Sequence, residues 1–225
     1  MAIGSLVLAL LIGGASVPAP PSKVEGYRRA VVAVGAAREA LASEYGAGAP
    51  ALGVARARAM RAIVDDLLPP WSGTPWDLNG TSETPGEGAI ACGYLVTTVL
   101  RDAGFNVPRA RMAQAASETI VRSLAPPSEV ARLTRGDRAK VIEHIRAKGP
   151  GLYVVGLDYH VGLVVFEGDR MDFCHSTVLP PGTALCEPAA TAAAFSSTLH
   201  VVAPLLTDWT IHRWLTGERF PVWQR

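Results

Sequence analysis

One cysteine and two histidines stand at the ends of elements that the sequence predicts. Cys92 follows a loop rich in glycine and proline and begins an apolar run whose spacing predicts a helix ending at Gly104. The first turn of a helix has unpaired N–H groups and the positive end of the helix dipole, and both favour a thiolate. We therefore expect a nucleophile with a lowered pKa at Cys92. The alternative is a small apolar residue packed beneath the helix, because free cysteines are often buried.

The two histidines lie on neighbouring predicted strands. His160 precedes an apolar, β-branched run at 161–166, a turn follows at 167–169, and His175 ends the returning strand. Because the ends of a hairpin's strands meet, we expect the two rings to be near-opposite neighbours. Asp172 has the opposite strand parity to His175, so only one of them can face the same side. A cysteine near two imidazoles would provide a nucleophile, a base and an orienting group.

These motifs, in this order, resemble those of the NlpC/P60-type papain-like cysteine peptidases and amidases. The resemblance rests on residues 91–94 (Ala-Cys-Gly-Tyr), 160–163 (His-Val-Gly-Leu) and 173–176 (Phe-Cys-His-Ser), and Gly93 stands where the family usually has serine. It implies a papain-like fold with Cys92 as nucleophile, His160 as base and His175 as the third member. It also implies hydrolysis of a peptide or amide bond in cell-wall peptides, without a cofactor. Asp172 as the third member would instead give a transglutaminase-like set.

A loop at 71–88, dense in tryptophan, proline, glycine and asparagine, precedes the candidate nucleophile and is expected to wall a cleft. The residues that we expect to contact the substrate are Trp76, Asn79, Glu87, Tyr94 and Tyr159. Acyl transfer to an amine would use the same residues. A different class of function, a non-catalytic ligand-binding module on the same fold, is also compatible with this sequence.

The predicted helices come first and the strands later. This segregation indicates an α+β fold, with a mostly antiparallel sheet packed on the nucleophile helix, and not an alternating parallel fold. Helices are expected at 23–45, 52–68, 92–103, 109–124, 137–148, 188–195 and 209–215, and strands at 152–157, 161–166, 171–175 and 199–206.

The apolar, uncharged start of the chain resembles a secretory signal peptide at 1–20, which predicts export to the periplasm or the outside of the cell. Residues 21–225 are then expected to form a single domain, with 21–70 as a helical hairpin packed on the catalytic core. Cys174 and Cys186 flank a Pro-Gly turn and would either pair in an oxidising compartment or stay reduced and buried.

Charge and residue spacing argue against a nucleic-acid binder and against a metal site. A formal net charge of +1, without a basic stripe, argues against a nucleic-acid binder. The remaining histidines and cysteines lack metal-ligand spacing, so no metal site is expected. We expect a monomer whose partner is a peptide or a peptidoglycan fragment, with no membrane span after processing.

Overall fold

The computed structural model describes residues 22–47, 52–134 and 137–224. Their elements are, in chain order, α1 (Lys23–Gly46), α2 (Leu52–Arg61), η1 (Ala62–Leu67), η2 (Pro69–Trp71), α3 (Cys92–Asp102), α4 (Arg109–Ala113), α5 (Ser117–Leu124), η3 (Pro127–Glu129), β1 (Ala131–Thr134), α6 (Arg138–Lys148), β2 (Gly151–Leu157), β3 (Val161–Glu167), β4 (Arg170–Ser176), β5 (Ala184–Pro188), η4 (Ala193–Phe195), β6 (Leu199–Pro204) and α7 (Asp208–Thr216). The fold is α+β, with the N-terminal helices preceding the sheet in sequence.

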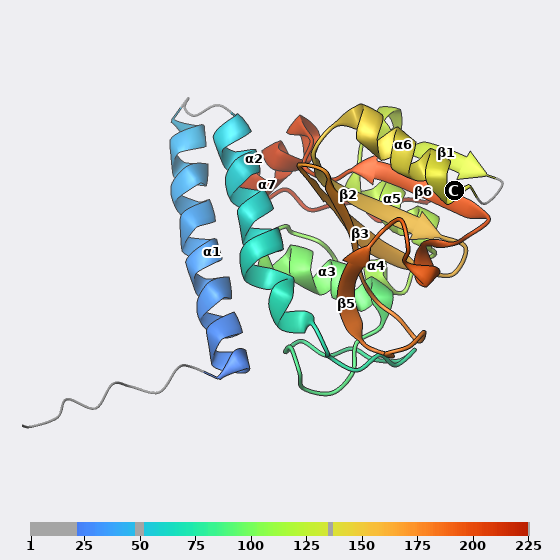
Figure 1. Cartoon of the computed structure of the whole chain (residues 1–225). Coiled ribbons are helices and arrows are strands. Elements are labelled where there is room, and N and C mark those ends of the chain that lie inside the picture. Colours follow the sequence, from blue (N-terminus) through green and yellow to red (C-terminus); the bar gives the residue numbers. More distant parts are fainter. Residues whose placement is uncertain (1–21, 48–51, 135–136, 225) are drawn as a thin grey trace, which may run out of the picture.

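The strands form one open antiparallel sheet of six strands, in the order β1-β6-β2-β3-β4-β5 (Figure 1). Strands β2 and β3 are buried along almost their whole length, on both faces. Their sequences are accordingly continuous apolar runs without polar alternation, which is typical of strands covered on both sides.

Alternate residues of the central strands fill two separate cores. Val154 faces the core that contains α3 and α5, and its neighbour Val155 faces the core that contains Val141 and Ile145 of α6. Helix α3 is buried from residue 93 to 100, since it lies between the sheet and the N-terminal helices. The sheet and the two cores therefore hold the start of α3 and the ends of β3 and β4 in fixed positions.

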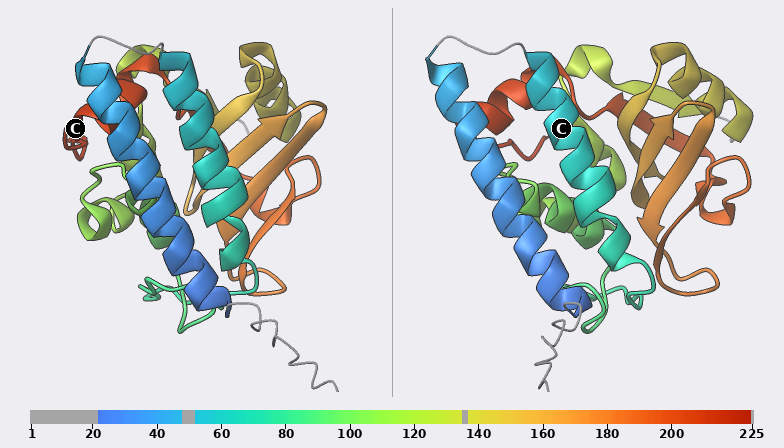
Figure 2. Two further views of the ribbon diagram at one scale, coloured as in Figure 1. Left: turned by 90° about the vertical axis from the view of Figure 1, so that its left-hand side faces the viewer. Right: turned by 60° about the vertical axis from the view of Figure 1, so that its left-hand side comes forward.

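Helices α1 and α2 lie side by side on one side of the sheet (Figure 2). Tyr27 and Val34 of α1 are buried in the same core as α3. The Tyr27 hydroxyl donates to Oδ2 of Asp102 at 2.6 Å, and Arg38 Nε donates to the Trp214 carbonyl at 2.6 Å. These partly buried contacts attach α1 to both α3 and α7.

Three expected elements differ from the structure, and two strands of the structure were not expected. The predicted helix at 109–124 is broken into α4 and α5, and the predicted helix at 52–68 changes after Arg61 to the π-helical turn η1. The short helix expected at 188–195 is wrong apart from a single 3-10 turn, η4. Strands β1 and β5 were not predicted, because short edge strands with polar residues carry little periodic signal. The expected leader at 1–20 lies outside the described residues.

Candidate active site

Cys92 is the first residue of α3. Ala91, the residue before it, has an extended backbone and contributes no side-chain cap, so the first N–H groups of the helix are left to other acceptors. Gly93 follows because α4 passes very close. A Cβ at Gly93 would come within 2.2 Å of the Ala113 carbonyl oxygen, which leaves no room for the serine that the resembled family usually has.

The electrostatic surroundings of Cys92 differ from the expectation of a lowered pKa. Burial raises the pKa of the Cys92 thiol above its ordinary value, and this outweighs hydrogen bonds to the sulfur from the backbone N–H groups of Val161, Gly93 and Cys92 itself. The expectation of a lowered pKa is therefore wrong for the resting protein. The sulfur nevertheless lies beside the N–H of Val161, the residue that follows His160, so the start of α3 meets the start of β3.

The two histidines are in direct contact. Nε2 of His160 lies 2.9 Å from Nδ1 of His175, and the ring centroids are 5.0 Å apart. The expected strand register is wrong by two residues: Leu163 pairs with Cys174, so continuing the ladder places Gly162, not His160, opposite His175. The predicted contact between the rings is confirmed, but they meet diagonally, because His160 lies in the loop just before β3. Gly162 is needed there, since a Cβ would lie 2.5 Å from the Phe173 ring, on which His175 stacks.

A carboxylate that the sequence analysis missed extends the hydrogen-bonded series of His160 and His175. Nε2 of His175 lies 3.0 Å from Oε1 of Glu187, a residue of β5. His175 is fully buried, whereas the Glu187 side chain is 32% exposed. The sequence contained a signal for this contact. If Cys174 and Cys186 pair across two antiparallel strands, Glu187 lies opposite Phe173, and Phe173 is on the same face of its strand as His175. Without a predicted strand at β5, this inference was not available.

The chain of hydrogen bonds fixes the tautomers of both rings. Glu187 as a carboxylate only accepts, so the hydrogen of neutral His175 lies on Nε2 and its Nδ1 is an acceptor. His160 must then donate from Nε2, which leaves its Nδ1 with a free lone pair. This assignment follows from the partners of the ring nitrogens. The result is a neutral imidazole that can take up a proton at Nδ1.

Both rings are held neutral. Burial, with a smaller contribution from the charge of His175, lowers the pKa of His160 from 6.5 to about 3. Burial lowers the pKa of His175 from 6.5 to about 4. Since the Cys92 pKa is raised and both histidine pKa values are lowered, the resting state at neutral pH has a protonated thiol and neutral imidazoles, and not a preformed thiolate–imidazolium pair.

Asp172 is separated from this chain of groups. It lies on the opposite face of β4 from His175, on the α3 side, and its Oδ2 forms an ion pair with Nε of Arg170 at 2.5 Å. The geometry brings His175, and not Asp172, into contact with His160. Cys174 and Cys186 form a disulfide with an S–S distance of 2.03 Å, so Cys92 is the free thiol of the three cysteines in the sequence.

The expected substrate-contacting residues have different surroundings. Tyr159, next to His160, is 98% exposed. Asn79 and Glu87 are exposed in the 71–88 loop. Trp76 is half-buried, and its backbone N–H donates to the Gly182 carbonyl of the facing loop. Tyr94 is instead buried: the Arg109 guanidinium lies over its ring, and its hydroxyl accepts a hydrogen bond from Gln114. The structure therefore gives Tyr94 a packing role, which its sequence position beside Cys92 did not indicate.

Within the described residues, no group of three or more His, Cys, Asp or Glu side chains is arranged to hold a metal ion. Across residues 22–47, 52–134 and 137–224, none of the helices combines the length and apolar character that crossing a membrane requires.

Comparison with known proteins leaves the site to be interpreted from its own geometry. No family model matches the chain, and no curated protein sequence matches it.

Proposed function

We propose that this protein is an exported, papain-like cysteine hydrolase that cleaves a peptide or amide bond through a thioacyl intermediate on Cys92. The observation that carries the proposal is the hydrogen-bonded series His160–His175–Glu187, with distances of 2.9 and 3.0 Å, together with the hydrogen bond to the Cys92 sulfur from the backbone N–H of Val161, the residue after His160. It combines a nucleophile at a helix N-terminus with a base whose tautomer is fixed by further groups, which is the arrangement that acyl transfer requires.

The reaction begins with proton transfer. His160 accepts the thiol proton at Nδ1 as the sulfur attacks the carbonyl carbon, because the resting thiol is not ionised. The negative oxygen of the tetrahedral intermediate would be stabilised by the backbone N–H of Cys92 and a donor from the loop at 76–87, an interaction worth about 3 kcal/mol in comparable sites. His160 then gives the proton to the leaving amine, which departs as the C–N bond breaks. Water, activated by the same imidazole, hydrolyses the thioester and restores the thiol.

His175 and Glu187 act through His160. The carboxylate keeps the hydrogen of His175 on Nε2, and His175 Nδ1 in turn accepts the hydrogen of His160 Nε2. When His160 becomes an imidazolium, the positive charge is stabilised along this series by a negative charge at its far end. Cell-wall peptides are the substrate class that the family resemblance implies. The disulfide supports export, since such bonds persist in oxidising compartments.

A non-catalytic ligand-binding module is the second candidate, and the raised pKa of Cys92 favours it. A buried thiol held mainly by backbone N–H groups is what a structural cysteine would also show. The two candidates differ in whether His160 withdraws the thiol proton.

The proposal is tested with a covalent thiol probe and mass mapping, followed by digestion of peptidoglycan fragments. The probe is expected to label Cys92, and the wild-type protein is expected to release new peptide termini from the fragments. Cys92→Ala should abolish release while its melting temperature stays within a few degrees of wild type, since the site is half-buried and the change is small. Equal release by Cys92→Ala would end the proposal.

A further inference from the structure

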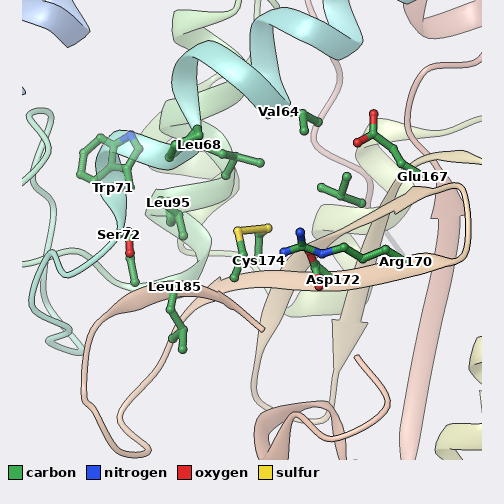
Figure 3. A pocket seen from close by; sticks show the side chains of 14 residues that line it. Val64, Leu68, Trp71, Ser72, Leu95, Glu167, Arg170, Asp172, Cys174 and Leu185 are labelled. Carbon is green, nitrogen blue, oxygen red and sulfur yellow. A yellow bond between two sulfur atoms is a disulfide. The ribbon is translucent and has the colours of Figure 1, made fainter. Parts of the chain in front are cut away.

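A large apolar cavity lies away from the cysteine and histidines. It has a volume of about 570 Å³ and is enclosed by the segment that follows α2, by α3, and by strands β3 to β5. Figure 3 shows its lining, which includes the side chains of Val64, Leu68, Trp71 and Leu95 and the disulfide between Cys174 and Cys186. Volumes of this size and apolar linings of this kind are typical of small-molecule sites.

One end of the cavity is charged. Glu167, Arg170 and Asp172 line it there, which gives two carboxylates against one guanidinium (Figure 3). Asp172 is only 8% exposed, and its Oδ1 has no hydrogen-bond donor among the described residues, although Oδ2 forms an ion pair with Arg170. A buried carboxylate oxygen without a donor is unfavourable by about 1–3 kcal/mol, so a donor arriving there would be bound strongly.

Arg170 is the group that covers this carboxylate. Its side chain is 79% exposed and contributes its Nε to Asp172, so it can turn into solvent without loss of packing. A cationic amine entering from the apolar side would replace the guanidinium as partner of Asp172 and would also be attracted by Glu167. An anionic headgroup would meet two carboxylates and is disfavoured.

The cavity is a separate site from the Cys92 site. Cys92, His160 and His175 are not part of its lining, and His175 faces the side of β4 opposite to Cys174. Leu95, one turn after Cys92 on α3, is the lining residue that shares a helix with the candidate nucleophile. Binding in the cavity therefore does not depend on the proposed hydrolysis.

From these observations we infer that the cavity binds a small amphiphile with an apolar chain and a cationic amine head. The chain lies against Leu68, Trp71 and the disulfide, and the ammonium donates to Oδ1 of Asp172. The inference goes beyond the proposed function, and its test uses no enzymatic activity.

The experiment is calorimetric titration of the full chain at pH 7 with decylamine, decanol and sodium decanoate, each below its micelle concentration. Decylamine is expected to bind with one-to-one stoichiometry and about tenfold more tightly than decanol, from its charge-assisted hydrogen bond, and decanoate more weakly still. Asp172→Asn should remove the tenfold preference for the amine. Val64→Trp, which fills the cavity from its partly exposed edge, should remove binding of all three.

Two controls show whether a loss of binding comes from unfolding and whether the effect is specific to the cavity. Each variant is checked by thermal unfolding, and Glu143→Gln, an exposed carboxylate on α6 outside the cavity, should bind like wild type. Should all three ligands bind equally, or should Val64→Trp be folded and still bind decylamine, the inference is overturned. Absence of decylamine binding to the wild-type protein overturns it as well.

Discussion

Replacement of Glu187 by glutamine tests whether the buried hydrogen-bonded series controls the reactivity of Cys92. Glutamine keeps the size of the side chain but removes its charge, so it no longer requires the hydrogen of His175 to lie on Nε2. A hydrogen bond to a charged group is worth about 1.5–3 kcal/mol. Because Glu187 is 32% exposed, solvent screening reduces the effect to about 1 kcal/mol, which corresponds to about a fivefold change in rate.

The assay is alkylation of Cys92 by iodoacetamide at pH 7.5, followed by mass spectrometry of the peptide that contains it. This needs no knowledge of the substrate, since the other two cysteines are held in the disulfide. We expect Glu187→Gln to react about five times more slowly than wild type. Glu167→Gln, which removes a carboxylate from β3 without touching either histidine, should react at the wild-type rate. Equal rates for wild type and Glu187→Gln, with both folded, would refute the role given to this carboxylate.

Three further outcomes follow from packing, titration and the disulfide. Gly93→Ala should lower the melting temperature by several degrees, because its Cβ would meet the α4 backbone at 2.2 Å, whereas Gly53→Ala on α2, with nothing within 4 Å, should leave it unchanged or raise it. The free energy of unfolding should fall as the pH drops below 6.5 toward 4, because the unfolded chain then binds protons that the buried neutral rings of His160 and His175 do not bind. Denaturant titrations should show a smaller fall for His175→Gln than for wild type. An identical fall in both proteins would contradict the buried neutral state. Replacing Cys174 and Cys186 by serine should cost roughly 3 kcal/mol in urea unfolding from loop entropy, and no measurable loss would mean that the cross-link constrains nothing.

The parts of the fold with strong local signals were predictable. Helix α3 follows from a long apolar period and a glycine stop, and the hairpin of β3 and β4 follows from a β-branched run, a Gly-Asp turn and a returning segment that contains Met171 and Phe173. The contact of His160 with His175 was predicted because hairpin ends must meet, even though the register was shifted by two residues. Such a shift keeps the parity of every side chain, so the prediction of contact survived it.

The parts that failed depend on tertiary surroundings. Burial of the Cys92 thiol follows from the loops and strands packed over the start of α3, and the helix dipole alone predicts the opposite pKa shift. Glu187 lies on an edge strand too short and too polar to be recognised. Substrate contact by Tyr94 stays a prediction, but a helical residue two positions on from Cys92 faces another side, and the Tyr94 ring packs beneath Arg109, which its position in the sequence does not indicate.

The central claim is that His160 withdraws the proton of Cys92, and the pH dependence of Cys92 alkylation tests it most directly. The account predicts that wild-type protein reacts faster than His160→Gln between pH 6 and 8, by about a hundredfold, which is the lower end of the usual contribution of a general base. The two rates should converge at higher pH, where the thiol ionises unaided. His144→Gln, on α6, should follow wild type. Superimposable profiles for wild type and His160→Gln would contradict the account.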